Sequence, residues 1–303
     1  MRLATVTTPY GTQAVRLADA PVTAATAANA ATTTLRGVEL DFEDVGALLR
    51  SGDWRTAAEM SGPEVEFAVS QLAPVIPEPG KIICIGLNYA KHIREMGREF
   101  PDCPTLFIKF PEALTGPYDD VVIPDYAQAK LDYEGELAVI MGRRAHRVAA
   151  SDALDYVAGY AIINDYTLRD FQRATTQFHA GKSFYRTAGF GPWLTTDWAP
   201  GGHVRLRTTV NGEVRQDDDT DDLIFSVAQL IEFCSQLYPL NPGDVIATGT
   251  PEGVGFARGQ FLGDGDVTRI SIEGLGAIEN RTRFDADGGN CSCGGDCSCA
   301  PES

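Results

Sequence analysis

The sequence predicts an α+β fold that is rich in β-strands and is preceded by a small N-terminal domain. Short apolar runs bounded by glycine, proline and asparagine recur along most of the 303-residue chain, as is typical of β-strands. Residues 224–237 have instead the apolar spacing of an amphipathic helix. The segment 74–80 contains three prolines and ends in glycine, so it breaks any regular element and marks the best domain boundary.

We therefore assign a small domain to residues 1–77, a larger domain to residues 78–286 and a tail to residues 287–303. In the small domain, short alternating segments predict strands, and residues 44–49 and 64–72 have the apolar spacing of helices. None of its residues indicates chemistry. We expect function to reside in the larger domain.

The charge and the apolar content of the chain narrow the classes of partner. A formal net charge of −17 and a pI of about 4.6 argue against nucleic-acid binding through a basic surface. No apolar run reaches the roughly 18 residues that a membrane-spanning helix needs, and the N-terminus lacks the apolar core of a signal peptide. We expect a cytoplasmic protein that acts on a small molecule and has no nucleic-acid or membrane partner.

Four of the seven cysteines are crowded into residues 291–299, with the spacing C-x-C-x₃-C-x-C. Ordinary zinc sites use differently spaced pairs, and glycines rather than apolar anchors surround these cysteines. We expect a disordered tail, and the alternative is a thiolate site for a soft metal or a redox tag. The other three cysteines are scattered, and we expect them to be reduced.

In the larger domain, the apolar runs predict a series of strands with a few helices between them. Strands are predicted at residues 81–85, 106–110, 121–123, 131–140, 159–163, 204–210, 245–247, 267–272 and 276–280. Residues 87–96 predict a helix with Asn88 as its N-cap. Asn211-Gly212 is a strong hairpin signal. The acidic run 217–222 lacks the spacing of a calcium-binding loop, so we expect a solvated loop.

Three carboxylates fall on alternate residues of the strand predicted at 131–140. Side chains two apart on a strand share a face, so we expect Asp132, Glu134 and Glu136 to point the same way. Such carboxylates repel one another unless a cation lies among them, and Mg²⁺ and Mn²⁺ prefer oxygen ligands. Asp165, directly after an apolar strand, adds a further carboxylate. The alternative is a solvated strand edge.

A histidine and a glutamate form a second candidate site on the helix predicted at 87–96. His92 and Glu95 are three residues apart and therefore share a helical face. An imidazole supported by a carboxylate is the minimum apparatus for taking a proton from water. The alternative is an ordinary surface pair. Lys182 lies in a glycine-flanked segment, and no acid next to it in the sequence explains its presence.

Taken in order along the chain, these residues and several short motifs resemble the fumarylacetoacetate hydrolase family. The resemblance covers about residues 80–283. It rests on Gly86-Leu87-Asn88-Tyr89 with His92 and Glu95, Lys109, Glu134-Gly135-Glu136, Asn164-Asp165 with Arg169, Asp170 and Gln172, Gly181-Lys182-Ser183-Phe184, Gly191-Pro192-Trp193, Asn241-Pro242-Gly243-Asp244 and Thr248-Gly249-Thr250-Pro251. Each motif is weak alone, but their joint order is highly specific.

The resemblance implies a fold and a metal site. The fold would be a mixed β-sandwich roll of the fumarylacetoacetate hydrolase type, flanked by helices, in a protein that is a homodimer. The metal would be Mg²⁺ or Mn²⁺, with Glu134, Glu136 and Asp165 as its ligands.

The resemblance also implies catalytic and substrate-binding residues. His92 and Glu95 would form an acid–base dyad. Lys182 would be a catalytic cation near the substrate oxygens. Gln172, Lys182 and Thr250 would contact the substrate.

These residue types lead us to expect a hydrolase that cleaves a carbon–carbon bond in an acylpyruvate-type 2,4-dioxo acid. The dyad would activate water, and the metal would stabilise the pyruvate enolate that leaves. The alternative is a decarboxylase, isomerase or hydratase of a related oxo-diacid, such as an oxaloacetate-like or hydroxy-dienedioate compound. A third possibility is a metal-dependent binding protein without catalysis, and the presence of both dyad residues argues against it.

Overall fold

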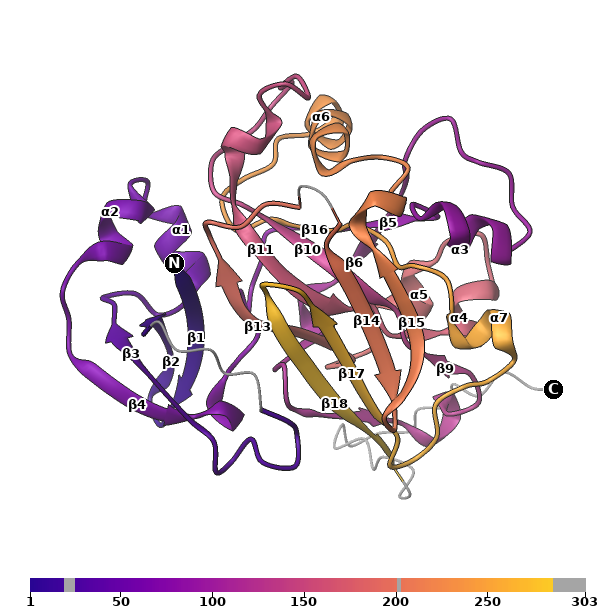
Figure 1. Cartoon of the computed structure of the whole chain (residues 1–303), viewed down its shortest axis with the longest axis horizontal. Helices are drawn as coiled ribbons and strands as arrows, with labels where there is room; N and C mark the ends of the chain where they lie inside the picture. Colours follow the sequence, from indigo (N-terminus) through magenta and orange to yellow (C-terminus); the bar gives the residue numbers. More distant parts are fainter. Residues whose placement is uncertain (19–24, 201–202, 286–303) are drawn as a thin grey trace, which may run out of the picture.

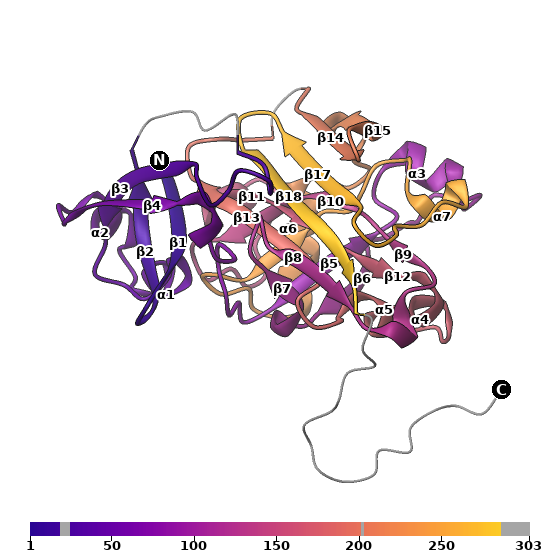
Figure 2. The same ribbon diagram turned by 90° about the horizontal axis from the view of Figure 1, so that it is seen from below.

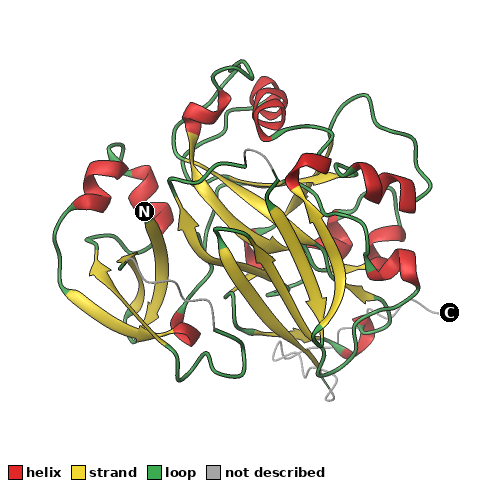
Figure 3. Ribbon diagram, in the orientation of Figure 1, coloured by secondary structure: helices red, strands yellow, loops and turns green. Residues whose placement is uncertain are grey.

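The computed structural model describes residues 1–18, 25–200 and 203–285, and β-strands make up much of it, as the sequence predicts (Figure 3). The tail predicted at residues 287–303 lies outside the described residues. Most described strands belong to a sheet of eleven strands or a sheet of five. The two sheets are stacked in the body of the molecule, and the first four strands extend to one side of it (Figure 1, Figure 2).

The first four strands form an antiparallel meander at one end of the large sheet. They are β1 (Arg2–Thr8), β2 (Gly11–Leu17), β3 (Thr34–Glu39) and β4 (Glu64–Ala68), and helices α1 (Val45–Arg50) and α2 (Trp54–Glu59) lie between β3 and β4 in the chain. The helix predicted at 44–49 is present as α1. The helix predicted at 64–72 is wrong, because β4 pairs with β3 and buries Phe67 in the core of this end. β1 also pairs with β13 (Ala188–Thr195), and the domain boundary at residue 77 stays a prediction.

The large sheet continues into the body in the order β13–β11–β10–β16–β5–β6. The strands not yet defined are β5 (Ile82–Gly86), β6 (Thr105–Lys109), β10 (Gly135–Met141), β11 (Val157–Asn164) and β16 (Val245–Ala247), and β7 (Leu114–Thr115) pairs with β13. The central strands β11, β10, β16 and β5 are buried on both faces of this sheet. On β5, Ile83 and Ile85 belong to one apolar cluster, while Ile82 and Cys84 belong to another. This double burial explains why the strands read as nearly continuous apolar runs.

The second sheet has the strand order β15–β14–β17–β18–β8. Its strands are β8 (Asp120–Ile123), β14 (Arg205–Val210), β15 (Glu213–Asp219), β17 (Val267–Ile272) and β18 (Gly276–Phe284). Asn211 and Gly212 join β14 to β15 with φ values of 51° and 82°, which confirms the predicted hairpin. The loop predicted at 217–222 is only partly present, because β15 extends to Asp219 and Asp217 pairs with Arg205 across the hairpin.

Apolar side chains of the two sheets and of one long helix form the core between them. Helix α6 (Val227–Leu237) confirms the amphipathic helix predicted at 224–237, and Ser226 caps its N-terminus. Leu230 and Ile231 of α6 belong to the same buried cluster as β-strand residues of both sheets. Among the described residues, no helix has the length and apolar character needed to cross a membrane.

In the described part of the chain, four short helices gather at the end of the body opposite the N-terminal meander (Figure 1, Figure 2). They are α3 (Ala90–Glu95), α4 (Arg169–Arg173), α5 (His179–Lys182) and α7 (Gly255–Arg258), and the paired strands β9 (Leu131–Asp132) and β12 (Thr167–Leu168) lie beside them. Several residues that the sequence singles out are on or next to these elements. The candidate site therefore lies at this end.

Candidate active site

A cavity of 380 Å³ lies at this end of the body, lined by residues of α3, α4, α5, β5, β6 and β10. The residues predicted from the sequence that line it are His92, Glu134, Glu136, Gln172, Lys182 and Thr250. Glu95 and Asp165 are not among the lining residues, but each contacts one that is. The fold thus gathers in one place residues that are spread over more than half of the sequence.

The strand predicted at 131–140 is interrupted in the structure. β9 ends at Asp132 and β10 begins at Gly135, so the regular alternation of side chains does not run through this segment. The expectation that Asp132 shares a face with Glu134 and Glu136 is therefore wrong. Only the two glutamates join Asp165 in the cluster of possible metal ligands.

Asp132 instead fixes two of the helices that border the cavity. Its carboxylate accepts hydrogen bonds from the backbone N–H groups of Gly255 (2.7 Å) and Phe256 (2.8 Å), at the start of α7. It also forms an ion pair with Arg169 of α4, whose guanidinium lies 2.7 Å from Asp132 Oδ2 and 2.7 Å from Glu134 Oε1. Asp132 therefore positions α7 and α4 relative to Glu134.

The glycine between the two glutamates is required by the close approach of the second sheet. A Cβ atom at Gly135 would clash with the hydroxyl of Thr208 on β14. The Gly135 N–H donates to the side-chain oxygen of Gln216 (3.0 Å), and the Gln216 amide donates to the Thr250 hydroxyl (2.8 Å). These contacts fix the backbone between the glutamates and hold Thr250 at the cavity wall.

Glu134, Glu136 and Asp165 bring carboxylate oxygens within 4.8 Å of one another, and all three side chains are buried. The register of β10 and β11 explains this, because Glu136 pairs with Ile163 and so places the end of β11 beside Glu134. The Asp165 N–H donates to the carbonyl of Glu134 (2.9 Å), and the Glu134 N–H donates to the side chain of Asn164 (3.0 Å). Backbone pairing therefore holds the three carboxylates together.

Two buried lysines contact this cluster. Lys182 Nζ lies 2.5 Å from Glu134 Oε2 and 2.7 Å from Asp165 Oδ2, which supplies the acids that its sequence neighbours do not. Lys109 Nζ lies 2.9 Å from Asp165 Oδ1 and also donates to the backbone carbonyl of Lys182. Sequence reasoning gave Lys109 no role of its own, because an apolar strand does not reveal which groups its one lysine reaches.

The two glutamates have pKa values displaced in opposite directions. Burial by itself raises the pKa of Glu134, but the charges of Lys182 and Arg169 outweigh it and lower the pKa to about 2. Burial, together with the negative charges of Asp165 and Glu134, raises the pKa of Glu136 well above its ordinary value. Glu136 is therefore the carboxylate of the cluster that most needs a further cation in order to ionise.

These residues fit a hard divalent cation. Three converging carboxylates are the oxygen donors that Mg²⁺ and Mn²⁺ prefer. Two of the three already bind an ammonium group, so the geometry accepts a cation. Glu136 accepts the Gly249 N–H (2.9 Å), but among the described residues no lysine or arginine forms an ion pair with it. Glu134, Glu136 and Asp165 are thus the residues that could hold the metal.

Helix α3 places the predicted dyad at the same cavity. His92 Nδ1 lies 2.7 Å from Glu95 Oε1. The two oxygens of Glu95 also accept the backbone N–H of Gly253, at 3.1 and 3.0 Å, a contact that the sequence did not indicate. Because Glu95 engages Nδ1, the other ring nitrogen, Nε2, remains for a proton or a substrate.

Asn88 holds the start of this helix in place, although it is not the N-cap. The prediction is wrong because the N-cap residue is Tyr89, which makes no side-chain cap. The Asn88 side chain instead accepts the N–H of Phe225 (2.9 Å) and donates to the carbonyls of Phe225 (3.1 Å) and Thr248 (2.8 Å). These bonds tie α3 to the segment before α6 and to the residue after β16.

Helix α4 contributes further side chains to the cavity. Gln172 accepts a hydrogen bond from Arg169 (3.0 Å). Arg173, and Arg98 from the segment after α3, also line the cavity, and sequence reasoning missed both. The spacing of Arg169 and Arg173 by four residues was the available signal, because it places both on one helical face.

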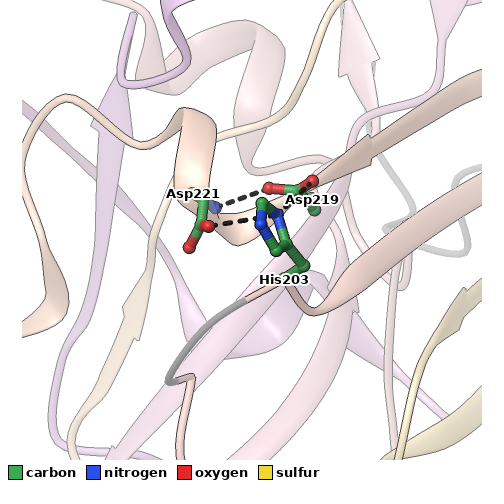
Figure 4. Close-up of side chains that lie close together, drawn as sticks. All are labelled: His203, Asp219 and Asp221. Atoms are coloured by element: carbon green, nitrogen blue, oxygen red, sulfur yellow. Dashed lines mark hydrogen bonds and ion pairs between the residues drawn. The ribbon is translucent and has the colours of Figure 1, made fainter.

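A second group of possible ligands lies outside the cavity. His203 Nδ1 lies 3.3 Å from Asp219 Oδ2 and 3.1 Å from Asp221 Oδ2 (Figure 4). The His203 side chain is 83% exposed, and Asp219 accepts the Asp221 N–H (2.8 Å) as the cap of a short turn. Turn capping and a surface ion pair account for this geometry.

Known protein sequences align with more than half of this chain. The family model described as "Fumarylacetoacetate (FAA) hydrolase C-terminal" matches residues 81–283. Oxaloacetate tautomerase YisK of Bacillus subtilis is 44% identical over 213 residues, which cover 68% of this chain and 71% of that protein.

Solved structures share its fold. The 5-carboxymethyl-2-hydroxymuconate delta-isomerase of Mycobacterium smegmatis has a TM-score of 0.74 and 32% identity, over 94% of this chain and 99% of that one. The fumarylacetoacetate hydrolase of Exiguobacterium antarcticum has a TM-score of 0.79 and 31% identity, over 94% and 100%. The mixed β-rich fold expected from the sequence is confirmed.

Proposed function

The chain belongs to the fumarylacetoacetate hydrolase family, and from this premise we propose that it is a metal-dependent isomerase that interconverts the keto and enol forms of a 2-oxo diacid such as oxaloacetate. The observation that carries the proposal is one cavity whose wall contains both His92 and the carboxylates of Glu134 and Glu136. Relatives named as a tautomerase and an isomerase favour this reaction over hydrolysis. We propose Mg²⁺ or Mn²⁺ as the cation.

Enolisation of a 2-oxo acid needs a base beside C3 and positive charge beside the 2-oxo oxygen. A divalent cation held by Glu134, Glu136 and Asp165 would supply Lewis-acid stabilisation of the charge on that oxygen. His92 Nε2 removes the proton from C3, while the Glu95 carboxylate holds Nδ1–H and stabilises the imidazolium. His92 then returns a proton to the 2-oxo oxygen. The C3–H bond breaks and an O–H bond forms, so no co-reactant is consumed.

Lys182 supplies a second positive charge at the cavity wall. Burial alone would lower its pKa, but Asp165 and Glu134 outweigh burial and raise the pKa, so Lys182 stays protonated. Its ammonium group can donate to a substrate oxygen as the enolate forms. Gln172 and Thr250 offer uncharged hydrogen-bonding groups in the same wall.

The proposal is tested by following deuterium exchange at C3 of oxaloacetate in D₂O by NMR. The purified protein is assayed with added Mg²⁺ or Mn²⁺ and again after treatment with EDTA. We expect metal-dependent exchange well above the uncatalysed rate, without release of pyruvate. Exchange at the background rate with either metal would contradict the proposal. Pyruvate and CO₂ release at the rate of exchange would indicate decarboxylation instead.

Hydrolysis of an acylpyruvate is the second candidate function, and the His92–Glu95 pair favours it. A base that removes a proton from C3 could also remove one from a water molecule beside a distal carbonyl. The same protein preparation is therefore assayed with acetylpyruvate, and acetate and pyruvate are measured by mass spectrometry. Stoichiometric release of both, faster than oxaloacetate exchange, would make hydrolysis the main activity.

A further inference from the structure

We infer that Arg173 binds the distal carboxylate of the substrate and thereby makes the protein selective for dicarboxylic 2-oxo acids. The inference rests on the proposed function, because it takes the 2-oxo end of the substrate to lie at Glu134 and Glu136. It assigns a residue to the distal end of the substrate, for which the proposed function names no cationic partner.

Arg173 is the last residue of α4 and shares a face of this helix with Arg169. Arg169 and Arg173 are four residues apart, so they lie on one face of the helix, one turn from each other. Both line the cavity, and Arg169 is the one that contacts the carboxylate of Glu134. Arg173 is therefore attached one helical turn after Arg169 and reaches the same cavity, where it forms no ion pair with the proposed metal ligands among the described residues and lies over the ring of Phe256.

The guanidinium of Arg173, unlike that of Arg169, is not neutralised by a carboxylate of the described residues. The Arg169 guanidinium is neutralised by Asp132 and Glu134. Arg173, by contrast, forms no ion pair or hydrogen bond with a side-chain carboxylate among the described residues, and its side chain is exposed to the cavity and solvent. A guanidinium in this state is a binding group for an anion.

The ring of Phe256 holds the side chain of Arg173 in place. Its guanidinium carbon lies 4.6 Å from the centroid of the Phe256 ring. A guanidinium stacked on a ring keeps the N–H groups along its edge free, and these match the two oxygens of a carboxylate. The backbone of Phe256 is fixed in turn, because its N–H donates to Asp132 (2.8 Å) at the start of α7.

Two arginines at the cavity offset the negative charge of the whole protein. The whole chain has a net charge of −17, which repels a dianionic substrate. Arg98 and Arg173, which both line the cavity, offset that field locally. Arg98 lies in the segment after α3, and no aromatic ring of the described residues holds its guanidinium, so we assign it to attraction of the substrate rather than to binding of one carboxylate.

The experiment compares the effect of each substitution on two substrates, one with and one without a distal negative charge. They are oxaloacetate and its 4-methyl ester, which keeps the 2-oxo acid end but removes the second negative charge. The C3 exchange rate is measured for the wild type and for Arg173→Gln, Arg173→Lys and Arg98→Gln. Arg144→Gln is the matched control, because Arg144 is an exposed arginine that does not line the cavity.

We expect Arg173→Gln to lower kcat/KM for oxaloacetate by about 10- to 100-fold, the scale of a lost charge-assisted hydrogen bond. For the ester, kcat/KM should change by less than about twofold, because no carboxylate is there to lose its partner. Arg173→Lys should recover part of the loss, and Arg144→Gln should behave as the wild type. This pattern supports a substrate-binding role.

An equal loss on both substrates would overturn the inference, because it would mean that Arg173 only positions α4 and Phe256. It would also be overturned if Arg173→Gln changed neither substrate, or if Arg98→Gln alone discriminated between them. Wild-type turnover of both compounds at equal kcat/KM would overturn selectivity while leaving the proposed function intact. Turnover of neither compound would overturn both.

Discussion

At the scale of single residues, the ion pairs of Lys182 predict which substitutions at the site destabilise the protein. Removing an ion from water costs several kcal/mol, and this cost is offset only when partners are close. Lys182 has two carboxylates within 2.7 Å, so both ion pairs are well formed. Neutralising Glu134 or Asp165 would remove one of the two ion pairs of the buried Lys182, so the free energy of unfolding should fall, by at most about 3–5 kcal/mol. Glu136 forms no such ion pair among the described residues and is the better probe of metal binding.

Glu136→Gln should weaken divalent-cation binding without destabilising the protein in the absence of metal. It removes one of three proposed ligands, and it also relieves the repulsion between Glu136 and the carboxylates of Glu134 and Asp165. We expect the metal-free Tm to stay the same or rise, and the increase in Tm on adding Mn²⁺ to be lost. Titration calorimetry and thermal unfolding measure the two effects.

The control for this substitution is Asp155→Asn, which neutralises an exposed acid that does not line the cavity. It should leave Mn²⁺ binding unchanged. Wild-type Mn²⁺ affinity in Glu136→Gln would show that Glu136 is not a ligand.

Glu95→Gln should slow catalysis while sparing metal affinity. Glu95 holds His92 Nδ1 at 2.7 Å and is itself held by Gly253, so it acts through the imidazole rather than on the substrate. Loss of its charge should lower kcat by about 10²-fold, within the usual range for acid–base catalysis. The KM for oxaloacetate and the Kd for Mn²⁺ should change little. The exposed Glu99→Gln is the matched control.

A parallel fall in kcat and Mn²⁺ affinity in Glu95→Gln would count against the dyad. That outcome would mean that Glu95 supports the metal site or the fold of the cavity as a whole.

At the scale of elements, α3 shows what a sequence pattern can and cannot reveal. The spacing of His92 and Glu95 is local, so the sequence predicts their contact, and the structure confirms it. The interruption between β9 and β10 is not local. It coincides with contacts of Asp132 to α4 and α7, and no pattern within 131–140 reports those distant elements.

The acidic segment at the end of β15 is a similar case. Its aspartates indicate a solvated loop by composition alone. In the structure, Asp218 is buried and pairs with Lys91 (2.6 Å), while the side chain of Asp222 accepts the Lys91 N–H (2.8 Å). Their role in holding α3 follows from tertiary packing, and composition alone does not reveal it.

Asn88→Ala should separate the anchoring of α3 from the chemistry on it. It removes three hydrogen bonds of a buried side chain, so the free energy of unfolding should fall by about 1–3 kcal/mol. Catalysis should fall as well, because His92 loses a fixed position. Asn88→Asp keeps the acceptor but directs a buried charge at two carbonyl oxygens, so it should lower the unfolding temperature at least as much as Asn88→Ala. Unchanged stability in both variants would show that α3 is held elsewhere.

At the scale of the whole molecule, the alternation of strands and turns was sufficient to predict a β-rich α+β fold. It was not sufficient to predict the order of the strands. The large sheet joins β1, near residue 2, to β13, near residue 195, and such pairing depends on contacts that are distant in sequence. The ion pairs of Lys109 and Lys182 likewise join residues that are distant in sequence. The order of the motifs, rather than any one spacing, predicted the residues that the structure gathers at the cavity.

The exposed apolar side chains beside β6 lead us to retain the prediction of a homodimer. In the described residues β6 is the last strand of the large sheet. Ile108 and Phe110 there are 50% and 47% exposed. Tyr126 and Tyr185 are 70% and 72% exposed, and the segment that carries Tyr185 contacts Phe110 through Ser183. Ile108→Lys should convert a dimer to a monomer in light scattering. Leu154→Lys, with a side chain of similar exposure elsewhere, should not. A monomeric wild type would contradict the prediction.

The most direct test of the proposed isomerase is the rate of C3 deuterium exchange in oxaloacetate, compared between the wild type and His92→Asn at equal, measured metal occupancy. We expect exchange by the Mn²⁺-loaded wild type to exceed that of the variant by about 10²- to 10⁴-fold, the contribution of a general base. Both proteins should bind Mn²⁺ with the same affinity, because His92 is not a proposed ligand. Equal exchange rates in the two metal-loaded proteins would contradict the account.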